Sequence, residues 1–316
     1  MGGNTRKSNG SFNASSRAKA DLPQSDTMAL IIDVQGAGHM SVKDAKDYFD
    51  KLGKTVDDLR AKNIPVTWVV MSKDNQSHLI KPENGLPDRR DLGKLSEFGF
   101  DGINRGEKNR MIFRQFLRDH GPQQNEAIYQ KFFKSAFVEP KDYADNDALR
   151  RTLQNDYRRD KKGNPVQLPD PQDDDPAFTS YLKDERGVKN VLVMGTVSTH
   201  CITATAIGAM KKGLAATIGI DGVLSWEGDE TKIDYATSKL RWRDGDALLA
   251  KDDFHRKKIE ERLDQMTDEE KQAWGLTDAD IASIKKNITT ASEFTAAHAQ
   301  HTSAPKVANM PAMAPT

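Results

Sequence analysis

The chain has 316 residues, 36% of them apolar, which is enough for one large or two ordinary globular domains. Its 47 Lys and Arg residues balance its 47 Asp and Glu residues, so no net charge attracts it to nucleic acid or to an anionic membrane surface. No apolar run approaches the roughly 20 residues of a membrane span, and a single cysteine excludes an internal disulfide. We therefore expect a cytoplasmic, globular protein that acts on a small molecule and has neither nucleic acid nor membrane as a partner.

Both ends of the chain have compositions that are typical of flexible tails. Residues 1–26 are rich in Ser, Asn, Gly and Lys, and residues 296–316 are similarly polar and poor in large apolar side chains. Such stretches cannot bury enough surface to offset the entropy lost on ordering. The sequence between them divides into a sheet-forming domain at 27–250 and a helical extension at 251–295.

Five short apolar runs, taken in chain order, predict the strands of a sheet. Helical patterns alternate with these runs, and this alternation is typical of βαβ units whose helices cover both faces of a parallel sheet. Between the first two runs, residues 41–63 have the pattern of an amphipathic helix that ends at Asn63, before Pro65. We therefore predict a three-layer α/β fold with a doubly wound, mostly parallel sheet. The runs are 28–33, 65–71, 126–131, 190–195 and 215–221.

Two segments interrupt the alternation, and a third follows the sheet. Residues 72–112 show little periodicity, and residues 139–176 contain "QLPDPQDDDP", which is typical of neither strand nor helix. Each is longer than an ordinary connection and is either a lid or specificity element or a tolerated surface insertion. The extension at 251–295 contains two capping boxes, which predict helices without visible chemistry. The boxes are Thr267 with Glu270 and Thr277 with Asp280.

Three reactive side chains stand at or soon after the ends of the predicted strands. Asp33 ends the first run, Lys131 ends the third, and Cys201 follows the fourth by six residues from Gly195. Each has an ordinary structural explanation when taken singly: a helix cap, an exposed strand end and a small buried side chain. Because ligands of open α/β sheets bind outside the carboxyl ends of the strands, we expect the three to meet at one site.

At these positions the sequence resembles the isochorismatase-like cysteine hydrolases, a superfamily that includes nicotinamidases, N-carbamoylsarcosine amidohydrolases and ureidoacrylate hydrolases. The first strand closes in the Asp-x-Gln pattern of that family, here Asp33 and Gln35. The family's nucleophilic cysteine lies six residues after a glycine, as Cys201 does after Gly195. The resemblance covers roughly residues 28–225.

The family's lysine lies four residues before a Ser/Gly-Ala-Phe segment. That spacing selects Lys131, ahead of Ser135 to Phe137, and not the nearer Lys134. One departure is clear: Gly36-Ala37-Gly38 replaces the Asn-Asp-Phe that follows the glutamine in the family, which puts the shape of the pocket beside Asp33 in doubt.

The resemblance implies hydrolysis of a small amide, ureide or related C–N bond through a thioester. In that mechanism Asp33 takes the proton of the Cys201 thiol as the sulfur attacks and returns it to the departing amine. Lys131 would hold Asp33 by an ion pair and favour the thiolate. The implied assembly is a homo-oligomer, and no cofactor is expected.

The resemblance also implies a particular backbone around the nucleophile. The N–H groups of Val197 and Cys201 would form an oxyanion hole, and the bond between Thr196 and Val197 would be cis. The side chains expected to contact substrate are Gln35, Phe137 and Thr196.

We predict no metal site. Nicotinamidases of this superfamily hold zinc or iron through an Asp-x-His-x5-His run after the second strand, whereas this chain has only Asp74 and His78 in that region. Three or more ligands must converge to hold such a metal.

Two other functions stay open. Members of the fold that lack the cysteine hydrolyse a vinyl ether, as isochorismatases do, and the fold could also serve as a non-catalytic interaction module. The complete set of Asp33, Lys131 and Cys201 favours thiol chemistry. Fast alkylation of Cys201 near neutral pH would separate a catalytic thiol from an inert buried one.

Overall fold

The computed structural model of the protein describes residues 25–35, 42–73, 76–86, 88–100, 107–156, 167–170, 178–224 and 252–303. Most of both predicted tails, the Gly36-Ala37-Gly38 departure, Asp74 and residues 225–250 lie outside these ranges. Within them, no helix combines the length and the apolar character that crossing a membrane requires.

The described residues form one seven-stranded sheet with the order β3-β4-β2-β1-β5-β6-β7. Neighbouring strands are parallel except for β3 and β4, which are antiparallel. All the strands predicted from apolar runs are present, and the prediction of a doubly wound, mostly parallel sheet is confirmed. The strands are β1 Thr27–Ile32, β2 Val66–Met71, β3 His78–Ile80, β4 Ala127–Lys131, β5 Asn190–Thr196, β6 Ala215–Leu224 and β7 Ile288–Thr289.

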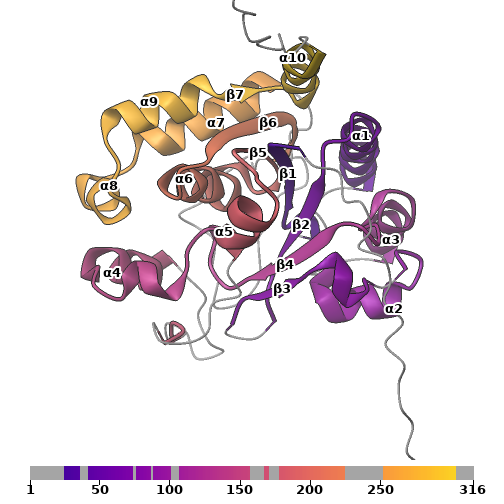
Figure 1. Ribbon diagram of the computed structural model, residues 1–316, viewed down its shortest axis with the longest axis horizontal. Helices are drawn as coiled ribbons and strands as arrows, with labels where there is room; N and C mark the ends of the chain where they lie inside the picture. The colour runs from indigo at the N-terminus through magenta and orange to yellow at the C-terminus, as the bar shows by residue number, and fades with distance from the viewer. Residues whose placement is uncertain are drawn as a thin grey trace, which may run out of the picture.

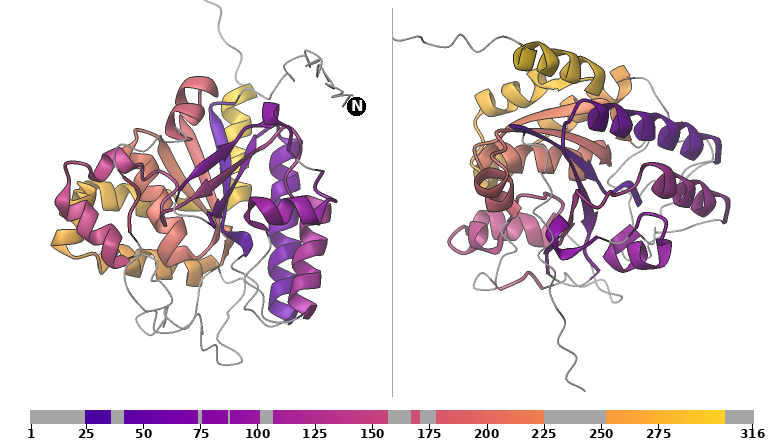
Figure 2. Two further views of the ribbon diagram at one scale, coloured as in Figure 1. Left: turned by 90° about the horizontal axis from the view of Figure 1, so that it is seen from below. Right: turned by 45° about the vertical axis from the view of Figure 1, so that its right-hand side comes forward.

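Helices cover both faces of the sheet, which gives the predicted three layers (Figure 1). Helices α1, α2 and α3 pack on one face, with α1 and α3 side by side, as Figure 2 also shows. Helices α5, α6, α7 and α9 pack on the other. The helices are α1 Val42–Ala61, α2 Leu92–Leu95, α3 Glu107–His120, α4 Asp147–Asp156, α5 Phe178–Ser180, α6 Thr203–Lys211, α7 Asp252–Asp264, α8 Asp268–Trp274, α9 Asp278–Lys286 and α10 Ala291–Ser303.

Helix α1 shows how the sequence pattern produces this packing. Its buried side chains recur at helical spacing along one face, and they contact the sheet and α3. After the last turn, Asn63 adopts a left-handed conformation with φ 57°, and the Ile64 N–H donates to the Leu59 carbonyl at 3.0 Å. This is a Schellman ending, which satisfies carbonyls that the helix itself leaves free. The buried residues are Ala45, Tyr48, Phe49, Leu52, Val56 and Leu59.

Both predicted insertions contain regular structure. Strand β3, helix α2 and the start of α3 lie within 72–112. Helix α4 lies within 139–176 and buries Leu149 and Leu153 in a cluster that includes Ala273 of α8. The second insertion is therefore packed against the C-terminal extension.

The extension is part of the sheet and not an appendage to it. Strand β7 pairs with β6, and Asp221 of β6 accepts a hydrogen bond of 2.6 Å from the Ala291 N–H, at the start of α10. Both predicted capping boxes are formed. Helix α10 continues to Ser303, so residues 296–303 are helical where the sequence predicts a tail.

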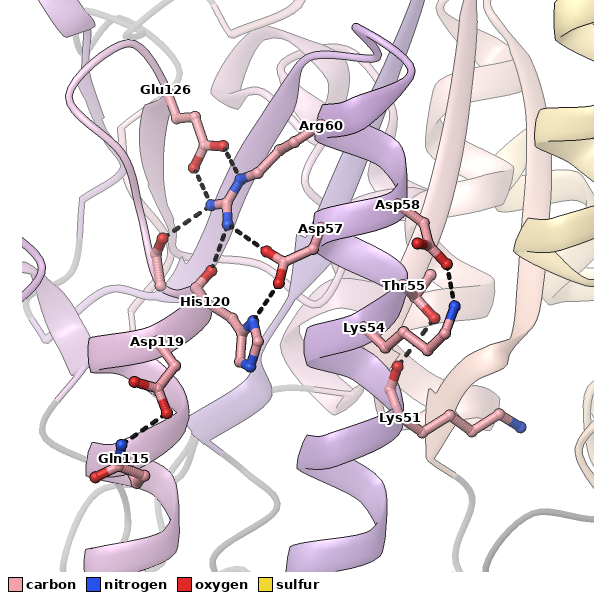
Figure 3. A network of polar contacts seen from close by, with 11 residues as sticks. Lys51, Lys54, Thr55, Asp57, Asp58, Arg60, Gln115, Asp119, His120 and Glu126 are labelled. Carbon is pink, nitrogen blue, oxygen red and sulfur yellow. Dashed lines mark hydrogen bonds and ion pairs between the residues drawn. The ribbon is translucent and has the colours of Figure 1, made fainter.

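A buried carboxylate joins α1, the end of α3 and the sheet. Glu126 is 5% exposed and pairs with Arg60 of α1 at 2.7 Å, and the indole N–H of Trp68 donates to it at 2.7 Å. Figure 3 shows the Arg60 guanidinium between Glu126 and Asp57. Arg60 also donates to the carbonyls of His120 and Gly121, at 2.9 and 2.8 Å. These contacts fix α1 and α3 to the strand that carries the site lysine.

The substitution Glu126→Gln should lower the free energy of unfolding by about 2–4 kcal/mol, because it leaves the largely buried Arg60 with only the exposed Asp57 as a counter-charge. The matched control is Asp57→Asn, whose side chain is 51% exposed and also contacts Arg60. For an exposed pair we expect a loss below about 1 kcal/mol. Urea unfolding measures both values. Equal losses would show that the buried carboxylate is not the stabilising partner.

Candidate active site

The candidate site lies where the connections of the sheet diverge. Strands β2, β4 and β3 lie on one side of β1, in that spatial order. After β4 the chain crosses over β1 and forms β5 on its other side. This is a topological switch point, where open α/β sheets leave a crevice at the carboxyl ends of the strands. Asp33 follows β1 directly, and Cys201 lies in the π-helical turn at Ser198–Ile202 between β5 and α6.

A glycine lets β5 approach β1 closely at this edge. Gly195 has φ 121°, and a Cβ atom on it would lie 2.0 Å from the Ile32 carbonyl oxygen. Directly after it, the bond between Thr196 and Val197 is cis. The Val197 carbonyl accepts hydrogen bonds from the N–H groups of His200 and Ile202, at 3.1 and 3.2 Å. The turn that carries Cys201 is thus pinned at its start.

The substitution Gly195→Ala should lower the free energy of unfolding by about 3 kcal/mol or more, because both its φ and its contact with backbone exclude a side chain. Gly187→Ala is the control: Gly187 also has a positive φ, 67°, but no atom lies within 4 Å of its added Cβ. We expect that control to lose about 1 kcal/mol, from the left-handed backbone alone. Thermal and urea unfolding measure the two decreases in the free energy of unfolding. Equal decreases in the two variants would contradict this explanation.

Lys131 and Asp33 form a buried ion pair across the end of β2. The Lys131 Nζ lies 2.7 Å from Asp33 Oδ2, and the two residues are 1% and 5% exposed. The Lys131 Nζ also donates to the Lys134 carbonyl at 2.7 Å. Burial lowers the pKa of Lys131, but its contacts with Asp33 and Cys201 outweigh burial and hold that pKa above its ordinary value. The lysine is therefore charged at neutral pH.

Hydrogen bonds to the backbone N–H and carbonyl of Asp33 hold this residue in place. Its carboxylate is not needed for that purpose. Its N–H donates to the Val69 carbonyl at 2.8 Å, and the Thr196 hydroxyl donates to its carbonyl at 2.5 Å. Its φ is 48°, a left-handed conformation that Asp tolerates better than most residues. Apart from Lys131 and the Cys201 thiol, no group of the described residues forms a hydrogen bond or ion pair with its carboxylate oxygens.

Cys201 is half-buried and completes the group. Burial raises the pKa of its thiol to about 12; Lys131 lowers it, and the neighbouring Asp33 carboxylate raises it further. The resting sulfur is therefore a thiol beside a carboxylate. Lys131 stabilises the thiolate as expected, but burial and Asp33 outweigh this effect on the pKa. Slow alkylation at neutral pH would therefore not show that this thiol is inert.

The alkylation rate of Cys201 by iodoacetamide should rise about tenfold per pH unit from about pH 7 to about pH 9.5, because the thiolate is the reacting form and the raised pKa keeps its fraction small. The urea-unfolded chain is the control and should level off near the ordinary thiol pKa. Asp33→Asn removes a group that raises the pKa, so alkylation at pH 7 should become faster. A plateau below pH 8 in the folded protein would contradict the raised pKa.

The three side chains expected to contact substrate have different surroundings. Gln35 is buried, and its Oε1 has no hydrogen-bond partner among the described residues. Thr196 is buried and positions Asp33 through its hydroxyl. The ring of Phe137 packs in the core 5.5 Å from that of Phe178. Packing accounts for Phe137, whereas Gln35 keeps an amide oxygen for a further partner.

The sequence does not predict three residues that lie near Cys201 in the structure: Lys134, His200 and Arg262. They line one cavity beside the turn that carries Cys201. The family spacing draws attention to Lys131 and passes over Lys134. No local pattern could have connected Arg262 of α7 with a cysteine 61 positions earlier, because only the packing of α7 on β6 and the turn brings them together.

The structure does not test the prediction of no metal. In the parts of the chain that are described, no group of three or more His, Cys, Asp and Glu side chains could hold an ion. His78 lies in β3 and is half-buried, and Asp74 is outside the described residues.

No protein-family model and no curated relative matches the chain. Solved structures with a similar arrangement include an isochorismatase-like hydrolase from Alkaliphilus metalliredigens, at 15% identity and a TM-score of 0.40, covering 87% of this chain and 99% of that one. A cysteine hydrolase from Pseudomonas syringae pv. phaseolicola 1448A is 14% identical with a TM-score of 0.37, covering 87% and 93%. An N-carbamoylsarcosine amidase from Thermoplasma acidophilum is 15% identical with a TM-score of 0.32, covering 67% and 88%.

These similarities do not indicate the activity of this protein, because each of the three TM-scores is below 0.5 and the sequence identities are 14–15%. The class of protein that the fold defines is a doubly wound α/β protein with a thiol, a carboxylate and an ammonium at its switch point.

Proposed function

We propose that the protein is a hydrolase that cleaves the C–N bond of a small amide or ureide through a thioester on Cys201. The observation that carries this proposal is the meeting of the Cys201 thiol with the buried pair of Asp33 and Lys131. A thiol beside a carboxyl group is a nucleophile beside its base, and Lys131 pairs with that carboxyl group at 2.7 Å. The motif resemblance supports the same chemistry.

In the first half of the reaction, the sulfur attacks the carbonyl carbon of the substrate while Asp33 accepts the thiol proton. The proton must move during the attack, since a thiol with a pKa of about 12 contains little thiolate at neutral pH. The C–S bond forms and the carbonyl electron pair moves to oxygen. When the C–N bond then breaks, Asp33 gives the proton to the leaving nitrogen, and the acyl group remains on Cys201.

In the second half, water replaces the amine. Asp33 accepts a proton from the water molecule as its oxygen attacks the thioester carbon. The C–S bond breaks, Asp33 returns the proton to sulfur, and a carboxylic acid leaves when the substrate is an amide, or a carbamic acid when it is a ureide. The site is then in its starting state, with the thiol protonated and Asp33 paired with Lys131.

Two backbone N–H groups are suited to the oxyanion that forms in both halves. The Val197 N–H makes no hydrogen bond within the described ranges, while its carbonyl is occupied by two donors. Cys201 lies in the first turn of the continuous helical stretch 198–211, so its N–H shares the positive end of the helix. We assign the oxyanion hole to the N–H groups of Val197 and Cys201.

A panel of small amides and ureides, scored by ammonia release, tests the proposal. Cys201→Ala should abolish turnover, and Asp33→Asn should lower kcat by about 10²–10⁴, the usual contribution of a general acid–base. An acid quench during turnover should leave the acyl mass on the peptide that contains Cys201. The Asp33→Asn variant is its own control, since its alkylation at pH 7 should increase while its hydrolysis is lost.

Three outcomes would contradict the proposal. Wild-type turnover in Cys201→Ala would exclude covalent catalysis by the thiol. Loss of activity with no acyl adduct under rapid quench would exclude the thioester. No hydrolysis across the panel, combined with no alkylation of the folded protein at any pH, would favour a non-catalytic module.

A further inference from the structure

An open cavity of about 410 Å³ lies at the edge of the sheet opposite to the candidate active site. Its walls are the loop at 88–90, the end of α3 and the loop at 122–124, which leads into β4. The cavity is therefore at the amino end of β4, whereas Lys131 is at the carboxyl end. The five residues of this strand, at roughly 3.3 Å each, separate the two edges by about 15 Å. A small ligand in the cavity would not reach Cys201.

The ionic side chains in the cavity wall carry an excess of positive charge. Among the described residues that line it, Arg89, Arg90 and Arg118 stand against Asp88, which leaves two positive charges. Arg90 Nε donates to both carboxylate oxygens of Asp88, at 3.0 and 3.1 Å. Hydrogen bonds from Arg90, with a smaller effect of the Arg89 charge, lower the pKa of Asp88 to about 2, so this group is ionised at neutral pH. In the described parts of the chain, no hydrogen bond or ion pair involves Arg89 or Arg118.

The acidic side chains near the end of α3 have other partners. Asp119 accepts a hydrogen bond of 2.7 Å from Gln115, and Figure 3 shows this contact. Glu126 is bound by Arg60 and accepts from the Gln123 N–H at 3.0 Å. The second contact also holds the loop that forms one wall of the cavity. The excess positive charge therefore faces solvent on a wall that is fixed before any ligand binds, which lowers the entropy cost of binding.

We propose that this cavity binds a small phosphate monoester, whose phosphate group contacts the guanidinium groups of Arg89 and Arg118. A phosphate monoester is close to a dianion near neutral pH, so it balances the two positive charges. Guanidinium groups match phosphate oxygens geometrically and can bind two of them at once. The cavity has the volume of a small-molecule site and leaves space for the organic part of the ligand beside Pro122. The inference does not rest on the proposed hydrolysis.

Phenyl phosphate is a suitable probe, and a ligand-observed NMR titration of the full-length protein at pH 8 and low salt measures its Kd. We expect a Kd on the order of 1 mM or tighter, which should rise at least about fivefold when salt is raised to about 0.5 M. Benzenesulfonate, which has the same ring and a single negative charge, should bind at least about fivefold more weakly. Inorganic phosphate, which lacks the ring, should bind at least about threefold more weakly.

Three variants locate the ligand. Arg89→Gln and Arg118→Gln should each raise the Kd of phenyl phosphate at least about threefold, because each removes one of the two charges that have no acidic partner. Arg114→Gln should leave the Kd unchanged. Arg114 is a matched control because it lies on α3 one turn before Arg118, is also exposed, and does not line the cavity. Thermal unfolding of the free variants verifies that each one is folded.

The alkylation rate of Cys201 by iodoacetamide separates this site from the active site. Saturating phenyl phosphate should leave that rate unchanged, and a slower rate with the same Kd would place the ligand at the nucleophile and overturn the inference. No binding at about ten times the expected Kd, equal binding of benzenesulfonate, or one Kd for all three variants would also overturn it. Inorganic phosphate that binds as tightly as phenyl phosphate would overturn the assignment to an organic ligand. None of these results tests amide hydrolysis, so failure here leaves the proposed function intact.

Discussion

The site depends on one constraint: a lysine that is 1% exposed must keep a counter-charge in contact. The cost of burying an ammonium without a partner is several kcal/mol, so Lys131 requires Asp33 at 2.7 Å. The two residues come from β4 and β1, which have β2 between them. The pair therefore fixes where the two strands end at this edge. At the other end of β4, Glu126 binds Arg60 and so fixes the helices α1 and α3 that cover the sheet. The charges that surround Cys201 are therefore set by residues at the ends of these strands.

The central strands and α1 were predictable because their apolar residues follow the period of the element that they form. β3 and β7 were not, since His78–Ile80 is half-buried and Ile288–Thr289 has only two residues. Helix α3 was missed for a different reason: its pattern begins in a polar stretch and runs past residue 112, where the irregular segment was taken to end. Partners far along the chain decide the two strands, since β3 pairs with β4 and β7 pairs with β6.

The candidate site was predictable only as far as its residues belong to short motifs. Asp33, Lys131 and Cys201 stand at fixed distances from strand ends, so the sequence could place them at one edge. Arg262 has no such relation to Cys201, and Phe137, although part of a motif, packs in the core. The raised pKa of the thiol also could not be predicted from the sequence, because it results from burial, which the fold determines.

The protonated state of Cys201 has a consequence for oxidation. Hydrogen peroxide attacks thiolates, and a thiol whose pKa is about 12 has very little thiolate at neutral pH. The chain has no second cysteine with which an oxidised sulfur could form an intramolecular disulfide. The burial that raises the pKa of the Cys201 thiol would thus slow its oxidation by peroxide. A single cysteine is therefore no reason to assign the protein to a reducing compartment.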